Sequence, residues 1–116
     1  MAVFSSHTLN GVDGTHAGGI AVSLRNLSNG EILFDTAMDA SGRLKQDINV
    51  EAVDTGAKYE LVFATGTYWK GRDIARDGAQ IMDEVVVRFA MPSATARYHI
   101  PVILSPNSYS IWWSGE

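Results

Sequence analysis

Short runs of alternating apolar and polar residues recur along the chain, and turn-forming residues separate them. Residues 20–27 show the pattern well, because Val22 and Leu24 fall on one face of the run and polar side chains fall on the other. Alternation with a period of two is typical of a β-strand that buries one face. Residues 28–30, Ser-Asn-Gly, then form the kind of tight turn that joins antiparallel strands.

This pattern predicts an all-β fold, a two-sheet β-sandwich of about eight mostly antiparallel strands. The strands are expected at residues 3–9, 20–27, 31–38, from 43 onward, 58–65, 84–91, 97–105 and 108–113. Residues 66–76 lack the alternation and are expected to hold a short helix or an ordered loop. With 116 residues, the chain is expected to form one domain over residues 1–116. A sandwich of this kind has exposed edge strands, which favours a homo-oligomer.

Composition narrows the class of protein. Apolar residues make up 46% of the chain, and the net charge of −4 comes from interspersed acidic and basic residues. Without a basic stripe to neutralise phosphates, nucleic acid is not an expected partner, and a small molecule is favoured. There is no apolar run of the ~18 residues that a membrane span needs. The chain has no cysteine, which excludes disulfides and thiolate chemistry, and no signal-peptide pattern, so a cytoplasmic location is expected.

The candidates for acid–base chemistry are three histidines. His99 lies inside an apolar strand, where a titratable ring needs a partner or a function. His7 lies in the first strand, and for both residues a structural imidazole satisfied by the backbone is an equal alternative. His16 lies in a Gly-rich loop and is expected to be exposed to solvent. Arg43 follows the turn at residues 39–42, and its residue type alone favours the surface.

Two imidazoles and a guanidinium would suit a hydrolysis that needs no metal and no cofactor. One histidine would take a proton from water, and the other would orient the water or protonate the leaving nitrogen. The arginine would stabilise the developing oxyanion. Other routes are less favoured, since the sequence contains neither a Gly-x-Ser-x-Gly motif nor histidines at metal-ligand spacing. The spacing does not by itself bring the three residues together.

Four motifs resemble those of the transthyretin-like 5-hydroxyisourate hydrolases. Residues 6–10 read Ser-His-Thr-Leu-Asn, similar to Ser-His-Val-Leu-Asp, and residues 39–43 read Asp-Ala-Ser-Gly-Arg, similar to Asp-x-Asp-Gly-Arg. Residues 59–69, YELVFATGTYW, resemble YxLxFDTGxYF. Residues 98–106, YHIPVILSP, resemble the end of HYHVPLLLSP. The motifs follow the family order over nearly the whole chain.

The resemblance implies a transthyretin fold with a short helix after the fifth strand, and a homotetramer whose sites lie in a channel between dimers. Family members of purine (urate) catabolism open the ring of 5-hydroxyisourate, a cyclic amide, without metal or cofactor. Their catalytic histidines and arginine fall on His7, His99 and Arg43. The hormone carrier transthyretin lacks this trio, so its presence favours catalysis over transport.

The C-terminus departs from the family pattern, in which Tyr-Ser is followed by Thr-Tyr-Arg-Gly-Ser. Here Tyr109-Ser110 is followed by Ile-Trp-Trp-Ser-Gly-Glu. Tyr109, Trp112, Trp113 and Ser114 are the expected substrate-binding residues. Trp112 stands where the family has tyrosine, so it would keep an aromatic wall but lose the phenolic hydroxyl. Trp113 replaces the arginine of the family motif. Ser114 comes one position before the place of the motif's final serine. The change predicts a more apolar site and leaves two alternatives: an enzyme for a more apolar ring in a specialised pathway, or a non-catalytic carrier of a small ligand.

Overall fold

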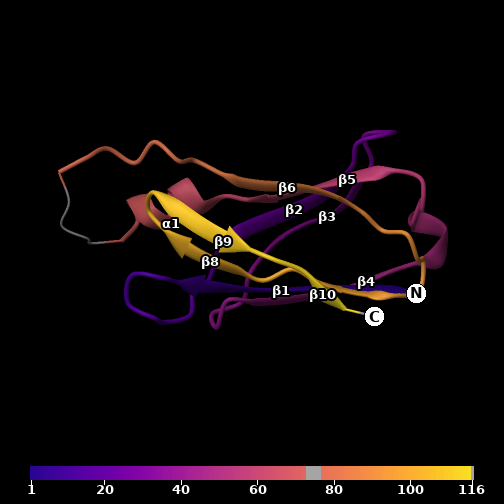
Figure 1. The fold of residues 1–116 in the computed structure, drawn as a ribbon, viewed down its shortest axis with the longest axis horizontal. Coiled ribbons are helices and arrows are strands. Elements are labelled where there is room, and N and C mark those ends of the chain that lie inside the picture. Colours follow the sequence, from indigo (N-terminus) through magenta and orange to yellow (C-terminus); the bar gives the residue numbers. More distant parts are fainter. Residues whose placement is uncertain (73–76, 116) are drawn as a thin grey trace.

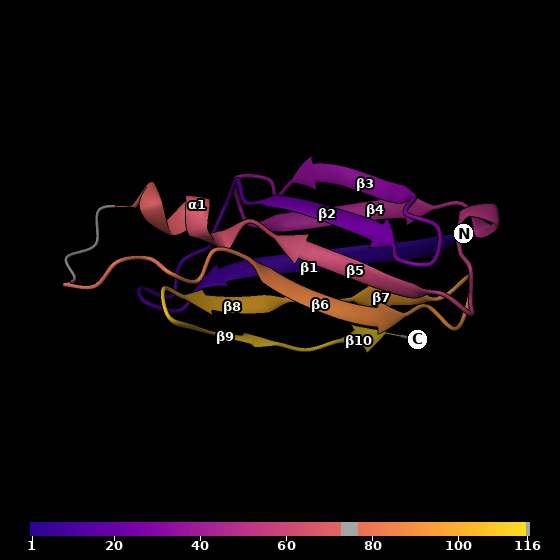
Figure 2. The same ribbon diagram turned by 90° about the horizontal axis from the view of Figure 1, so that it is seen from above.

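The computed structural model describes residues 1–72 and 77–115 as two packed β-sheets (Figure 1, Figure 2). Within these residues the strands are β1 Ala2–Asn10, β2 Ala21–Asn26, β3 Ile32–Ala37, β4 Arg43–Ile48, β5 Lys58–Phe63, β6 Val85–Ala90, β7 Arg97–His99, β8 Val102–Ser105, β9 Ser108–Ile111 and β10 Ser114–Gly115. A short 3-10 helix, Val50–Ala52, precedes β5, and helix α1, Thr65–Lys70, follows it. The helix or loop predicted at residues 66–76 is thus helical at its start, while residues 73–76 lie outside the described residues.

Strand β1 is the centre of the first sheet. It pairs antiparallel with β4 on one side and parallel with β7 and β8 on the other, and β10 and β9 pair with β7 and β8. The second sheet has the order β3-β2-β5-β6, entirely antiparallel. Figure 1 shows the two layers, with β2, β5 and β6 above β1 and β4. The predicted fold, a mostly antiparallel two-sheet sandwich with one short α-helix, is confirmed.

The strand predicted at residues 97–105 is divided into β7 and β8 by Pro101. Proline has no N–H and cannot donate a hydrogen bond to β1. The pairing with β1 nevertheless keeps one register across the break, since Ser5 pairs with His99 and Thr8 pairs with Val102. The two segments are therefore one interrupted strand.

The last predicted strand is divided in the same way into β9 and β10. Ile111 pairs with Val102, and Ser114 pairs with His99, so the two segments also keep one register. The break falls at Trp112 and Trp113, where the backbone nitrogen of Trp112 lies 3.4 Å from its carbonyl acceptor, Pro101 O. Ten segments thus correspond to the eight strands that the alternation predicts.

Alternation along β1 decides which side chains form the core. Its even-numbered residues are buried between the sheets, and Phe4 packs there against Phe34 with ring centroids 5.4 Å apart. Trp69 of α1 is 1% exposed, and burial of a side chain of this size contributes about 2–3 kcal/mol. The odd-numbered residues, including Ser5 and His7, lie on the outer side. Among the described residues, no helix has the length and apolarity to cross a membrane.

Candidate active site

The strand pairing places the three predicted catalytic residues on one outer face of the first sheet. His7 on β1 pairs with Arg43 on β4, and Ser5 pairs with His99 on β7. Paired residues on neighbouring strands project to the same side of a sheet. Their alternating neighbours, including Leu44 of β4, are buried on the inner side. The topology therefore gathers His7, Arg43 and His99, which lie far apart in the sequence.

The position of Arg43 is set by the turn before β4. The Asp39 carboxylate accepts hydrogen bonds from the backbone amides of Arg43 and Ser41, each at 2.9 Å. The hydrogen bond from the Arg43 amide is the main cause that lowers the pKa of Asp39. Gly42 has φ +72°, and its carbonyl oxygen accepts a hydrogen bond from the Thr8 amide at 2.7 Å. The turn thus connects Arg43 directly to the strand that carries His7.

Gly42→Ala is expected to destabilise the protein and to displace Arg43. A Cβ at this position would collide with the carbonyl oxygen of Thr8, in addition to the ~1–2 kcal/mol cost of a left-handed conformation in a non-glycine residue. Gly30→Ala is the matched control, since Gly30 has φ +77° and open space around its Cβ position. Urea unfolding measures both variants. Equal losses of unfolding free energy would contradict the collision.

His99 is oriented by a hydroxyl group. Its Nδ1 lies 2.8 Å from Ser5 Oγ, which leaves Nε2 as the ring nitrogen available to a ligand. A cavity of about 320 Å³ opens beside it, lined by Ser5, Ser6, Asp39, Arg43, Leu44, Lys45 and His99. Within the described ranges, Arg43 forms no ion pair. Its guanidinium is therefore available to a negatively charged group in the cavity.

His7 contacts His16, a residue that the sequence predicted only to be exposed to solvent. His16 is exposed, as expected, but its Nδ1 lies 2.9 Å from His7 Nε2. The pKa of His7 is lowered by burial first, then by the positive charges of Arg43 and His16, while a hydrogen bond to the backbone of Ser41 raises it. The lowered pKa keeps His7 neutral to lower pH than an ordinary histidine. The turn-forming residues at 10–14, Asn-Gly-Val-Asp-Gly, were the only feature of the sequence that indicated that the chain folds back beside β1.

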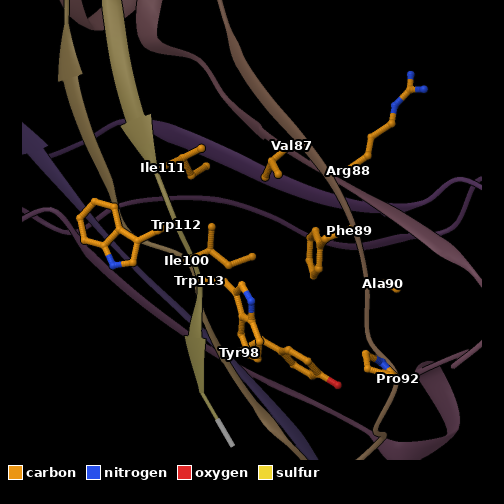
Figure 3. A pocket seen from close by; sticks show the side chains of 10 residues that line it. All are labelled: Val87, Arg88, Phe89, Ala90, Pro92, Tyr98, Ile100, Ile111, Trp112 and Trp113. Atoms are coloured by element: carbon orange, nitrogen blue, oxygen red, sulfur yellow. The ribbon is translucent and has the colours of Figure 1, made fainter.

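Two of the predicted substrate-binding residues share the face of the trio. Ser114 pairs with His99, so its side chain lies on the same side as that imidazole. The register continued from β10 places Trp112 opposite Pro101, on the outer side. Figure 3 shows the Trp112 ring pointing away from Ile111 and Trp113, on the other side of the C-terminal segment.

The other two predicted substrate-binding residues lie on the inner side of the sheet. Tyr109 pairs with Leu104, which is buried in the core. Trp113 points toward Tyr98 and Phe89 at the open edge of the sandwich (Figure 3). The apolar cavity there has about 490 Å³ and is lined by Val87, Arg88, Phe89, Ala90, Pro92, Tyr98, Ile100, Ile111, Trp112 and Trp113. Both tryptophans thus line this cavity, but their rings lie on opposite sides of the C-terminal segment (Figure 3).

The outer face presents an acid–base set. In the part of the chain that the structure describes, no three His, Asp or Glu side chains are placed to hold a metal ion. The polar groups that do meet are imidazoles, a guanidinium and hydroxyls. Such a set can move protons and stabilise an oxyanion.

Comparison with known proteins shows to which family this chain belongs. The model of the HIUase/Transthyretin family matches residues 4–113. The chain belongs to this family. It is 30% identical to the 5-hydroxyisourate hydrolase of Pseudomonas aeruginosa over 114 residues, covering 97% of this chain and 90% of that protein. The family resemblance predicted from the four motifs is thus confirmed.

Solved structures in the HIUase/Transthyretin family confirm the fold. The 5-hydroxyisourate hydrolase of Klebsiella pneumoniae has a TM-score of 0.77 at 24% identity, over 98% of this chain and 99% of that chain. Transthyretin from Sparus aurata has a TM-score of 0.76 at 23% identity, over 97% of both chains. Because a hydrolase and a transthyretin match almost equally well, the fold does not separate catalysis from carriage. That distinction depends on the side chains of the outer face.

Proposed function

We propose that this protein is a hydrolase that opens the ring of 5-hydroxyisourate, with His7, Arg43 and His99 as its catalytic residues. The observation that carries the proposal is that β1, β4 and β7 present these three side chains on one open face. The cavity of about 320 Å³ beside Arg43 and His99 offers room for a substrate. The name 5-hydroxyisourate hydrolase, carried by a relative that matches nearly the whole chain, supports the substrate.

Each catalytic residue has a role that follows from its surroundings. His7, whose pKa is lowered by burial and by Arg43, takes a proton from water, and the resulting hydroxide adds to the ring carbonyl carbon. The Arg43 guanidinium stabilises the oxyanion. His99, in its imidazolium form and held at Nδ1 by Ser5, gives a proton from Nε2 to the ring nitrogen as the C–N bond breaks, and becomes neutral. Proton exchange with solvent then returns His7 to its neutral form and His99 to its imidazolium form.

Ser114 and Trp112 complete this site in the proposal. Ser114 lies beside His99 and offers a hydroxyl to a polar edge of the substrate. Trp112 lies on the same face and offers a flat apolar surface for stacking. Ser114→Ala is therefore expected to raise KM more than it lowers kcat, and an unchanged KM would remove Ser114 from the site.

The pH dependence of kcat/KM tests the role of His7. A base must be neutral to act, and a lowered pKa keeps His7 neutral to lower pH than an ordinary histidine. The acidic fall in kcat/KM is therefore expected below pH ~6.5, the ordinary value for histidine. Initial rates on 5-hydroxyisourate between pH 5 and 8 would measure it. An acidic limb above the ordinary value would contradict His7 as the base.

We further propose a homotetramer in which Tyr109 and Trp113 contribute to subunit contacts. β6 and β9 are edge strands, and the side chains of Trp113 and Tyr109 are 63% and 42% exposed beside that edge. Exposed edges with apolar side chains are commonly covered by a second copy. Light scattering is expected to give four times the chain mass, and Trp113→Glu to give smaller species. A wild-type mass of one chain would contradict the assembly.

A further inference from the structure

His7 and His16 form a direct pair of imidazole rings beside the catalytic face. Nε2 of His7 and Nδ1 of His16 are 2.9 Å apart, with ring centroids 5.0 Å apart and an interplanar angle of 36°. At this distance one nitrogen donates its N–H and the other accepts it. Two N–H groups cannot face each other there. Both rings therefore cannot be fully protonated while the pair is intact.

The loop between β1 and β2 holds His16 in this position. Its backbone folds back on β1, so that Leu9 pairs with His16 as an isolated β-bridge. Hydrogen bonds flank the bridge: the Asn10 amide donates to Thr15 O at 2.8 Å, and the Ala17 amide donates to Thr8 O at 2.9 Å. The backbone around His16 is thus fixed on both sides. The pairing of the two rings follows from this local architecture.

Several charged groups act on His7, and His16 is the side chain that is hydrogen-bonded to its ring. Arg43 faces His7 from β4, and His99 acts on it from β7. The Asp39 carboxylate, which lies in the turn before β4, accepts hydrogen bonds from the amides of its own turn. Within the described residues, no carboxylate forms an ion pair with His7. A catalytic base is usually oriented by a third group, and here the backbone of Ser41 and the imidazole of His16 both contact the His7 ring.

We propose that His16 is a positioning residue for His7: the hydrogen bond between the rings fixes the orientation of His7, and the pair takes up one added proton where two separate histidines would take up two. Its effect on turnover rests on the proposed function, while the pairing itself does not. His16 thereby keeps the His7 ring in one orientation in every turnover. Interacting groups of this kind titrate as a unit.

NMR titration of the full chain labelled with 15N-histidine tests the pairing without any substrate. The chain contains three histidines, so His99→Asn and His16→Asn assign the signals. In the wild type, the His7 and His16 signals are expected to shift together as the pair takes up its one added proton. In His16→Phe they are expected to follow a single titration at a higher pKa, because the positive charge of His16 is lost. Thr15→Val is the matched loop control and should leave the His7 titration unchanged.

Turnover separates a positioning role from a structural one. His16→Phe is expected to lower kcat for 5-hydroxyisourate about tenfold with little change in KM, because the base loses its orientation. His16→Asn keeps a hydrogen-bonding group near the Nδ1 position and is expected to retain kcat within about threefold. A His7 titration that is the same in the wild type and in His16→Phe would overturn the proposal. If the wild type showed no turnover, the proposed function would fail, and the titration would still decide the pairing.

Discussion

Arg43→Ala is expected to reduce kcat/KM for 5-hydroxyisourate by about 10²- to 10³-fold, the range for loss of one oxyanion-stabilising group. Arg43 is exposed on the outer face of the first sheet, opposite His7, and its backbone is fixed by Asp39. The substitution removes the guanidinium and leaves the backbone hydrogen bonds of the turn in place. Thermal unfolding should therefore change little while activity falls. Steady-state rates and circular dichroism measure the two effects.

Two further variants define what Arg43 contributes. Arg43→Lys retains a positive charge but loses the planar donor geometry, so it should recover only part of the activity. Arg25→Ala is the control, because Arg25 lies on the other sheet and pairs with Glu60 at 3.1 Å. It should keep full activity. Full activity in Arg43→Ala would show that the assigned site is wrong.

His99→Asn is expected to lower kcat by about 10²- to 10⁴-fold, as is typical when a general acid or base is lost. An asparagine amide can still interact with Ser5, whose Oγ lies 2.8 Å from His99 Nδ1. It cannot, however, carry a proton to the leaving nitrogen. The expected loss is therefore chemical, with the fold retained. Single-turnover rates with excess protein would isolate it from product release.

Ser5→Ala is the companion to His99→Asn. It removes the hydroxyl that orients His99 and leaves the imidazole itself in place. A loss of about tenfold is expected, smaller than that of His99→Asn, because orientation is lost and proton transfer remains. If Ser5→Ala lost as much as His99→Asn, the hydroxyl would have a direct role that this assignment lacks.

The fold was largely predictable because the alternation along each strand is strong. In residues 20–27 and 58–65 the alternation of apolar and polar residues shows which side chains are buried, and both ranges contain strands of the second sheet. The interruptions at Pro101 and at Trp112–Trp113 were not predicted. They depend on the hydrogen bonds between neighbouring strands in the folded sheet, which the alternation along one strand does not reveal. The parallel pairing of β1 with β7 and β8 is likewise a property of the assembled sheet.

The residue types of the proposed site came from the sequence, while their arrangement came from the structure. His7, Arg43 and His99 were identified through family motifs, and the strand registers place them on one face. His16 was missed because its contact with His7 depends on how a Gly-rich loop folds back. Trp113 was grouped with Trp112 from its position in the motif. The period of two along the strand separates their side chains.

The most direct test of the central claim is the hydrolysis of freshly prepared 5-hydroxyisourate by the purified chain, followed by its ultraviolet absorbance. The compound also decays without catalyst, so the rate constant in buffer alone is the reference. The account predicts a decay rate that rises in proportion to protein concentration and returns to the buffer rate with the Arg43→Ala, His99→Asn double variant. A wild-type rate equal to that of buffer at every protein concentration would contradict it.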